Sequence, residues 1–363
     1  MDRTVAPAVR AFSNLYMPEL RRVTLDNGIT LSIADGCNHD VNRLSLMWNG
    51  GTAEVQAPSV ATLTMQLMRE GSALHSGEEL SKAFDFNGSW IKGVAQSHSS
   101  SVVMHSINSR MDTVLPLFAE MVAEPEFPEQ ALSAQRESLA GSVEIARTRV
   151  DNMSQRAVRD MIFGKSHPLA KDETPDEIRS ISRGDLIDFH ASVIGNALPD
   201  IFIAGRITPA IEDAVNRWFG QFKPKGEPLS LNVVKPEPVS GSAVNIVDYP
   251  GAKQSSVKIA IPTIGREHSD YIDLRLAVIA LGGYFGSRLM TNIREEKGLT
   301  YGINAGLYGY REGGVVLIGA QTDNSTAGTV IAETISELRR LKSGDMDGDE
   351  IMRLKRFEMS QLA

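Results

Sequence analysis

The sequence has few residues of the kinds that form disulfides or metal sites. Cys37 is the single cysteine among 363 residues, which excludes an intrachain disulfide. Seven histidines are present, and no two are four residues apart, the spacing that lets one helix face hold a metal ion. His98 and His105 are the nearest pair, and both fall in a strand-like tract, where we expect surface or half-buried residues.

Long apolar runs are also missing. No window approaches the 18 uninterrupted apolar residues of a membrane helix, and residues 1–16 lack the apolar centre of a signal peptide. The net charge of -8 argues against a nucleic-acid partner and against an anionic membrane surface. We therefore expect a soluble protein of the cytoplasm, which fits the near absence of cysteine.

Two domains are expected in a chain of this length. The tract 223–240 is rich in proline and predicts a linker, placed at residues 226–240, between an N-terminal domain (1–225) and a C-terminal domain (241–363). The tracts 93–107 and 302–319 are hairpin-like and match in order and spacing, which indicates two copies of one domain. The second copy stops at Ala363 inside its last helical pattern, so we expect it to be incomplete.

Within each copy, strands in hairpins alternate with helical patterns. Asn27-Gly28 between two alternating runs predicts a tight hairpin over 22–35, and Ser76 with Glu79 predicts a capped helix. The other predicted elements of the first copy are a strand at 43–49, a hairpin at 90–107, a strand at 201–204 and helices at 57–69, 111–123, 128–147, 152–163 and 209–222. In the second copy they are a strand pair within 243–262, a hairpin at 300–321 and helices at 271–281, 287–296, 325–341 and from 347 onward. The pattern predicts an α+β fold, with a mainly antiparallel sheet and helices on one face of it.

Two motifs carry a resemblance to a known family. The run LDNGITL (25–31) and the run LGGYFGSRLMTNIREEKGLTY (281–301) make the chain similar to insulinase- and pitrilysin-type zinc peptidases, including the processing peptidases of mitochondria. The resemblance implies the processing-peptidase/LuxS-like metallohydrolase fold, with two homologous domains.

In active members of that family the first long helix carries H-x-x-E-H, two zinc ligands and a general base. Here the matching residues are Thr62, Met65 and Gln66, none of which can replace them. Glu144 matches the third ligand and cannot hold zinc alone. The resemblance therefore implies no metal or other cofactor in this chain, with zinc expected only in a partner.

The second family constellation is intact. Arg294 and Tyr301 have the R-x6-Y spacing of the pair that, in the family, binds the carbonyl beside the scissile bond. The alternative is an ion pair of Arg294, for instance with Glu295, and a packed tyrosine. The tract Trp90–Val102 matches the edge strand on which the family binds an extended peptide, but Lys92-Gly93 replaces the usual Asn-Ala pair, so peptide binding there is in doubt.

Three functions remain open. The first is a non-catalytic, substrate-binding subunit that acts on peptides or unfolded proteins, paired with a zinc-bearing homologue or with a second copy of itself. The second is a scaffold or peptide-binding protein with no role in proteolysis. The third is an active metallopeptidase with a rebuilt metal site, which the lack of zinc-binding side chains argues against.

Overall fold

The computed structural model describes residue 4 and residues 18–231, 233–237 and 244–362. The expectation that residues 1–16 are not a signal peptide concerns a segment that lies almost wholly outside the described residues. The chain forms two compact units. The N-terminal unit consists of Pro18–Thr148 and Phe163–Glu237. The C-terminal unit contains Arg149–Ile162 and the described residues from 244 to 362.

The N-terminal unit is built on a six-stranded sheet in the order β1-β2-β6-β3-β5-β4. β2 and β6 are parallel, and all other neighbours are antiparallel. The strands are β1 (Leu20–Thr24), β2 (Thr30–Asp35), β3 (Val41–Asn49), β4 (Trp90–Ala95), β5 (Ser99–Ile107) and β6 (Asp200–Gly205). The predicted hairpin at 22–35 is confirmed, with Gly28 in the left-handed region at φ 88°.

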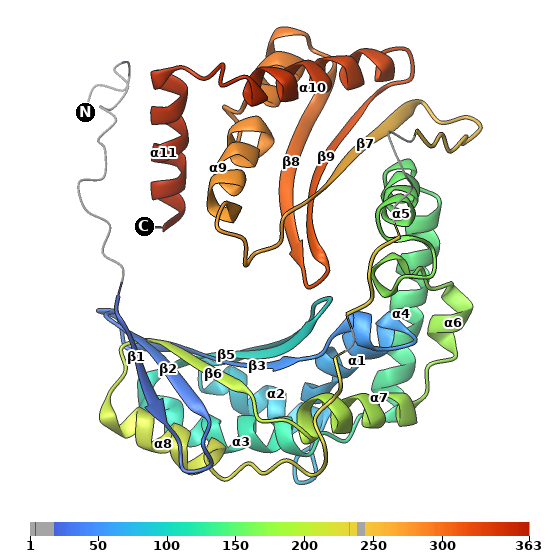
Figure 1. The fold of residues 1–363 in the computed structure, drawn as a ribbon. Helices are drawn as coiled ribbons and strands as arrows, with labels where there is room; N and C mark the ends of the chain where they lie inside the picture. Colours follow the sequence, from blue (N-terminus) through green and yellow to red (C-terminus); the bar gives the residue numbers. More distant parts are fainter. Residues whose placement is uncertain (1–3, 5–17, 232, 238–243, 363) are drawn as a thin grey trace. The chain divides into compact units, whose positions relative to one another are not determined.

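Helices cover one face of this sheet (Figure 1). The α-helices of this unit are α1 (Pro58–Leu67), α2 (Gly77–Phe86), α3 (Met111–Ala123), α4 (Glu129–Arg147), α6 (Pro175–Arg179), α7 (Arg183–Phe189) and α8 (Pro209–Phe219). Among them, α6 packs on α4 beyond the end of the sheet (Figure 1). The strand residues that face the helices are buried, as Leu44 and Leu46 show at 0% exposure each. The expected capping box is present, because the Ser76 and Glu79 side chains each accept from the other's backbone N–H.

The C-terminal unit has a three-stranded antiparallel sheet in the order β7-β9-β8. Its elements are β7 (Gln254–Thr263), α9 (Tyr271–Gly282), the π-helix η6 (Met290–Glu296), β8 (Thr300–Tyr310), β9 (Gly313–Asp323), α10 (Ala327–Lys342) and α11 (Gly348–Leu362). A second, smaller core lies between this sheet and its helices, around Leu281, Leu289, Ile293 and Ile318. The predicted α+β class with two antiparallel-rich sheets is confirmed.

Three local expectations need correction. The strand pair within 243–262 is a single strand, β7; of the remainder, residue 243 is not described and residues 244–253 form no strand. Val244 and Ile246 are 86% and 85% exposed, so the segment has the alternation of a strand without a neighbour to pair with. The helix expected at 287–296 is largely a π-helix, and the one at 57–69 ends at Leu67 and continues as a 3-10 turn.

The helix α5 (Val150–Phe163) groups with the C-terminal unit, although it belongs to the first half of the sequence. Its Ser154 Oγ lies 2.8 Å from Ser256 Oγ on β7. The proline-rich tract is anchored on the N-terminal unit, because Val234 O lies 3.0 Å from the Nε2 atom of buried His167 and Glu237 N donates to Phe163 O. The single boundary at 226–240, part of which is not described, stays a prediction.

Candidate functional site

The helix that should carry the metal motif is α1. Met65, in the position of the general base, is 2% exposed and belongs to the hydrophobic core. Thr62 is half-buried, and Gln66 is exposed. Thr62 and Gln66 are four residues apart and share a helix face, but neither is a good zinc ligand, and the buried thioether of Met65 cannot accept a proton from water.

Backbone packing at α1 is unusually close. A Cβ atom built on Gly93 of β4 would lie 1.8 Å from the carbonyl oxygen of Met65. Glycine is thus the residue that allows α1 to approach β4 here. The helix backbone therefore lies directly against the strand at Met65, the residue at the position of the catalytic base.

Glu144, the position of the third zinc ligand, lies on α4 with its side chain 68% exposed. Its carboxylate is 3.7 Å from Arg179 Nη2 on α6. In the described residues, no group of three or more His, Cys, Asp or Glu side chains could hold a metal ion. The residues at the motif positions therefore do not fit zinc, by their chemistry and by their placement.

A carboxylate from another part of the chain, Glu173, caps the N-terminus of α1. Glu173 Oε2 accepts hydrogen bonds from Ser59 N at 2.8 Å and Ser59 Oγ at 2.6 Å. Its Oε1 atom is buried without a hydrogen-bond partner. Burial raises the pKa of the Glu173 carboxyl, although the Ser59 donors favour its charged form. Glu173 is thus a structural cap that sequence reasoning did not find.

The second constellation lies wholly in the C-terminal unit. Arg294 is on the π-helix η6, and its guanidinium carbon lies 4.7 Å from the ring centroid of Phe285. Within the described chain, Arg294 forms no ion pair. The expected alternative, an ion pair with Glu295, is therefore not what holds this side chain; the contact with Phe285 orients it and leaves its hydrogen-bond donors free.

Tyr301 stands at the start of β8 and is 94% exposed. The register of β8 against β9 shifts between Thr300 and Ile303. Thr300 Oγ1 stabilises this irregularity by accepting from Gly302 N at 3.1 Å and donating to Gln321 O at 2.5 Å. Such a bulge re-aims a side chain away from the regular ladder. The tyrosine is therefore not packed, and the alternative of a structural Tyr301 is wrong in this structure.

Arg294 and Tyr301 line one open pocket of 610 Å³. Gly298, at φ 61°, makes the turn between them. The remaining lining residues come from β7, η6, β8 and β9 and from the turn: Gln254, Glu295, Leu299, Thr300, Gln321, Thr322 and Asp323. The pocket places the donors of Arg294 and Tyr301 beside a lining that is about as apolar as it is polar, which suits a peptide carbonyl together with its neighbouring carbon atoms.

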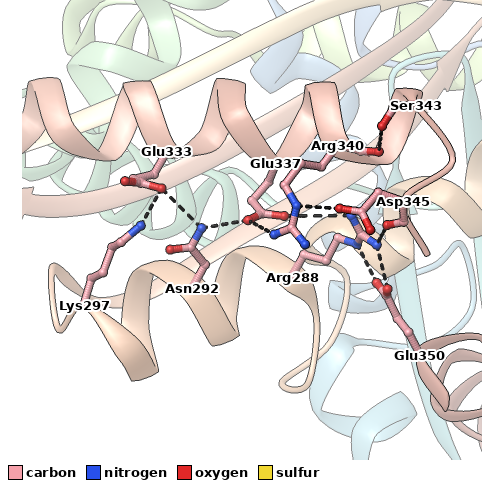
Figure 2. A network of polar contacts seen from close by, with 9 residues as sticks. All are labelled: Arg288, Asn292, Lys297, Glu333, Glu337, Arg340, Ser343, Asp345 and Glu350. Carbon is pink, nitrogen blue, oxygen red and sulfur yellow. Dashed lines mark hydrogen bonds and ion pairs between the residues drawn. The ribbon is translucent and has the colours of Figure 1, made fainter. Parts of the chain in front are cut away.

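A buried polar network supports the segment that carries Arg294 (Figure 2). Arg288 forms a paired contact with Glu350, with Nε–Oε1 and Nη2–Oε2 distances of 2.6 and 2.7 Å. Asn292 Nδ2 donates to Glu337 Oε1 at 2.7 Å, and Lys297 lies 2.5 Å from Glu333. Because Glu337 and Glu350 are 2% and 9% exposed, the network ties η6 to α10 and α11. Within the 281–301 motif, the charged residues Arg288 and Lys297 were the sequence signal from which this network could have been predicted.

The two histidines nearest in sequence have separate surroundings. His98 Nδ1 lies 3.1 Å from Glu54 Oε1. The ring of His105 stacks on Trp90, with centroids 4.1 Å apart. β4 is an edge strand of its sheet, as the family pattern implied, with α1 packed closely against Gly93.

Fold and site together define a peptidase-like protein whose motif helix offers no zinc ligands. Residues 180–357 match the family described as the peptidase M16 inactive domain. A Bacillus subtilis protein, the uncharacterized zinc protease YmxG, is 21% identical over 332 residues, which are 88% of this chain and 79% of that protein. The probable inactive metalloprotease YmfF of the same organism is 22% identical over 261 residues, or 68% of this chain and 59% of that protein.

A solved structure shows the same fold. The crystal structure of a peptidase M16 inactive domain from Pseudomonas fluorescens has a TM-score of 0.85 and 23% identity, and covers 95% of this chain and 84% of that one. These matches confirm the predicted resemblance to this class of peptidases. The chain is a homologue of these peptidases whose motif positions hold Thr62, Met65 and Gln66 in place of zinc ligands and base. No described helix is both long enough and apolar enough to cross a membrane.

Proposed function

We propose that the chain is the substrate-binding, non-catalytic subunit of a two-part zinc peptidase that acts on peptides or unfolded proteins. A homologous partner would supply the H-x-x-E-H helix with its metal. This chain would supply Arg294 and Tyr301, whose guanidinium and phenol donate hydrogen bonds to the carbonyl oxygen of the bond to be cut. A cytoplasmic location is part of the proposal, supported by the single cysteine.

One observation carries the proposal. Arg294 and Tyr301 border the same pocket, while neither takes part in an ion pair within the described residues and Tyr301 is 94% exposed. An exposed phenol and an unpaired guanidinium add little to the stability of a fold. Their donors are available to a ligand. On α1, in contrast, Met65 at the position of the base belongs to the hydrophobic core.

The test uses the full chain reconstituted with a zinc-bearing homologue from the same genome. Cleavage of an internally quenched peptide is compared for the wild type and for the double variant Arg294→Ala, Tyr301→Phe. Removing one oxyanion donor typically lowers kcat by about 100- to 1,000-fold. We therefore expect the double variant to lose at least about 100-fold in kcat while still assembling with its partner in gel filtration.

The matched control is Arg339→Ala with Tyr308→Phe, which removes the same functional groups at exposed positions of the same unit that do not line the pocket. It should keep wild-type turnover. Unchanged turnover in the Arg294, Tyr301 variant would favour the scaffold function instead. Chelator-sensitive cleavage by this chain alone would overturn the division of labour.

A further inference from the structure

The six-stranded sheet of the N-terminal unit has a face that its own helices do not cover (Figure 1). The residues that alternate with the buried ones point to this face. Trp90, Phe202 and Met47 there are 52%, 41% and 37% exposed. They lie on three strands and in three different rows of the register, so they form no single apolar patch, and a ligand of this face would also contact the polar side chains between them.

The strand register places these side chains in rows. Arg43, His105 and Trp90 are direct neighbours across β3, β5 and β4. In the next row, Ser45 of β3 is followed by Val103 and Lys92. The Trp90 and His105 rings are nearly parallel, at 8°. Burial and the adjacent Arg43 lower the pKa of His105, so the stacked pair is a neutral, flat platform at pH 7.

The same face is basic in a chain whose net charge is -8. Its strand residues include Arg22, Arg43 and Lys92, none of which forms an ion pair within the part of the chain that the structure describes. Asp200, opposite Met47 in the register, is the one carboxylate among the described strand residues of this face. Three unpaired cations beside aromatic and aliphatic side chains fit a ligand that is both acidic and partly apolar.

We propose that this face binds an extended, acidic segment of a polypeptide, with Arg43 and Lys92 pairing with its carboxylates and Trp90 with His105 contacting an apolar side chain between them. The proposal rests on the proposed peptide-binding function and adds a second contact area for the same substrate. Arg43 and Lys92 are two strands and one row apart, which is roughly 12 Å at ordinary sheet spacings. An extended peptide covers about 3.4 Å per residue, so the matching carboxylates are three to four residues apart.

The experiment uses tryptophan fluorescence of the full chain in a Trp218→Phe background, which leaves Trp90 and the buried Trp48. The probe is a 12-residue peptide of Leu, Ala and Ser with two glutamates four positions apart. We expect a saturable change in emission, weakened by 500 mM salt, and no change with lysine in place of both glutamates. The variant Arg43→Glu, Lys92→Glu should weaken binding by about tenfold or more.

The matched control is Lys82→Glu with Arg217→Glu, an equal change of charge on α2 and α8. It should bind the peptide like the Trp218→Phe parent. Turnover of the Arg294→Ala, Tyr301→Phe variant is measured separately from the fluorescence of the two charge reversals, so this proposal can fail while the proposed function stands, and the reverse. Equal affinity for the glutamate and lysine peptides, or equal loss in both double charge reversals, would overturn the proposal. So would tighter binding of a single-stranded oligonucleotide.

Discussion

Gly93→Ala tests whether α1 lies directly against β4. The new Cβ would be 1.8 Å from Met65 O and 2.6 Å from Met65 C, whereas ordinary contacts of a Cβ atom are 3.4 to 4 Å. Strand and helix must therefore separate by about 1.5 Å, and the atom in the way is backbone that cannot change rotamer. Overpacking of a core costs about 1–3 kcal/mol, so we expect a loss at or above the upper end of that range.

Urea unfolding followed by tryptophan fluorescence is the assay, because Trp48, Trp90 and Trp218 all lie in the N-terminal unit. The control is Gly141→Ala, in the interior of α4 of the same unit, where a Cβ would meet nothing within 4 Å. Alanine is favoured over glycine in a helix, so this variant should gain about 0.5–1 kcal/mol. If Gly93→Ala unfolds within about 0.5 kcal/mol of the wild type, the close approach of α1 and β4 is refuted.

Two further predictions concern carboxylates that are partly or wholly buried. The raised pKa of Glu173 means that its protonated form stabilises the folded unit below the unfolded pKa, and that this contribution is lost as pH rises through the folded pKa. Glu173→Gln keeps an acceptor for Ser59 but cannot ionise, so its stability relative to the wild type should increase as the pH rises from 4.5 to 7.5. The measurement is urea unfolding followed by tryptophan fluorescence, and a difference that does not change with pH would contradict this. In the C-terminal unit, Arg288→Ala removes the ion-pair partner of buried Glu350, whereas Glu337 keeps its ion pair with Arg340 at 2.9 Å. The variant should destabilise the unit by about 3–5 kcal/mol, measured by circular-dichroism melting. Arg339→Ala on exposed α10 should change stability by less than about 0.5 kcal/mol, and equal losses in the two variants would show that the network carries no special stability.

The fold could be predicted where the signal was local. Asn27-Gly28 supplied its own turn geometry, and the capping box at Ser76 and Glu79 satisfied its own backbone donors. The segment 244–253 has strand-like alternation, but a strand also needs a paired neighbour, and alternation alone cannot supply one. The packing of α5 on β7 depends on residues about 100 positions away in sequence, such as Ser256 for Ser154, so no local pattern could indicate it.

In the candidate site, too, the features set by neighbouring residues could be predicted, and those set by contacts between distant strands could not. Arg294 and Tyr301 are close in sequence, and the turn at Gly298 was enough to expect them near each other; their role stays a prediction. Gln254, Gln321 and Asp323, which complete the pocket, come from the paired strands β7 and β9 and needed the sheet register to be found. The bulge that exposes Tyr301 depends on Thr300 bonding to Gln321, again a contact between strands.

The grouping of α5 with the C-terminal unit affects how the chain can be divided. The polypeptide passes between the units at residues 148–149, 162–163 and 237–238. A fragment ending at residue 225 would carry α5 without Ser256 and the sheet on which it packs, and the remaining fragment would lack that helix. We therefore expect the two units to be inseparable as fragments cut at residue 225. An exchange of the C-terminal unit with that of a homologue should succeed only when residues 149–162 move with it.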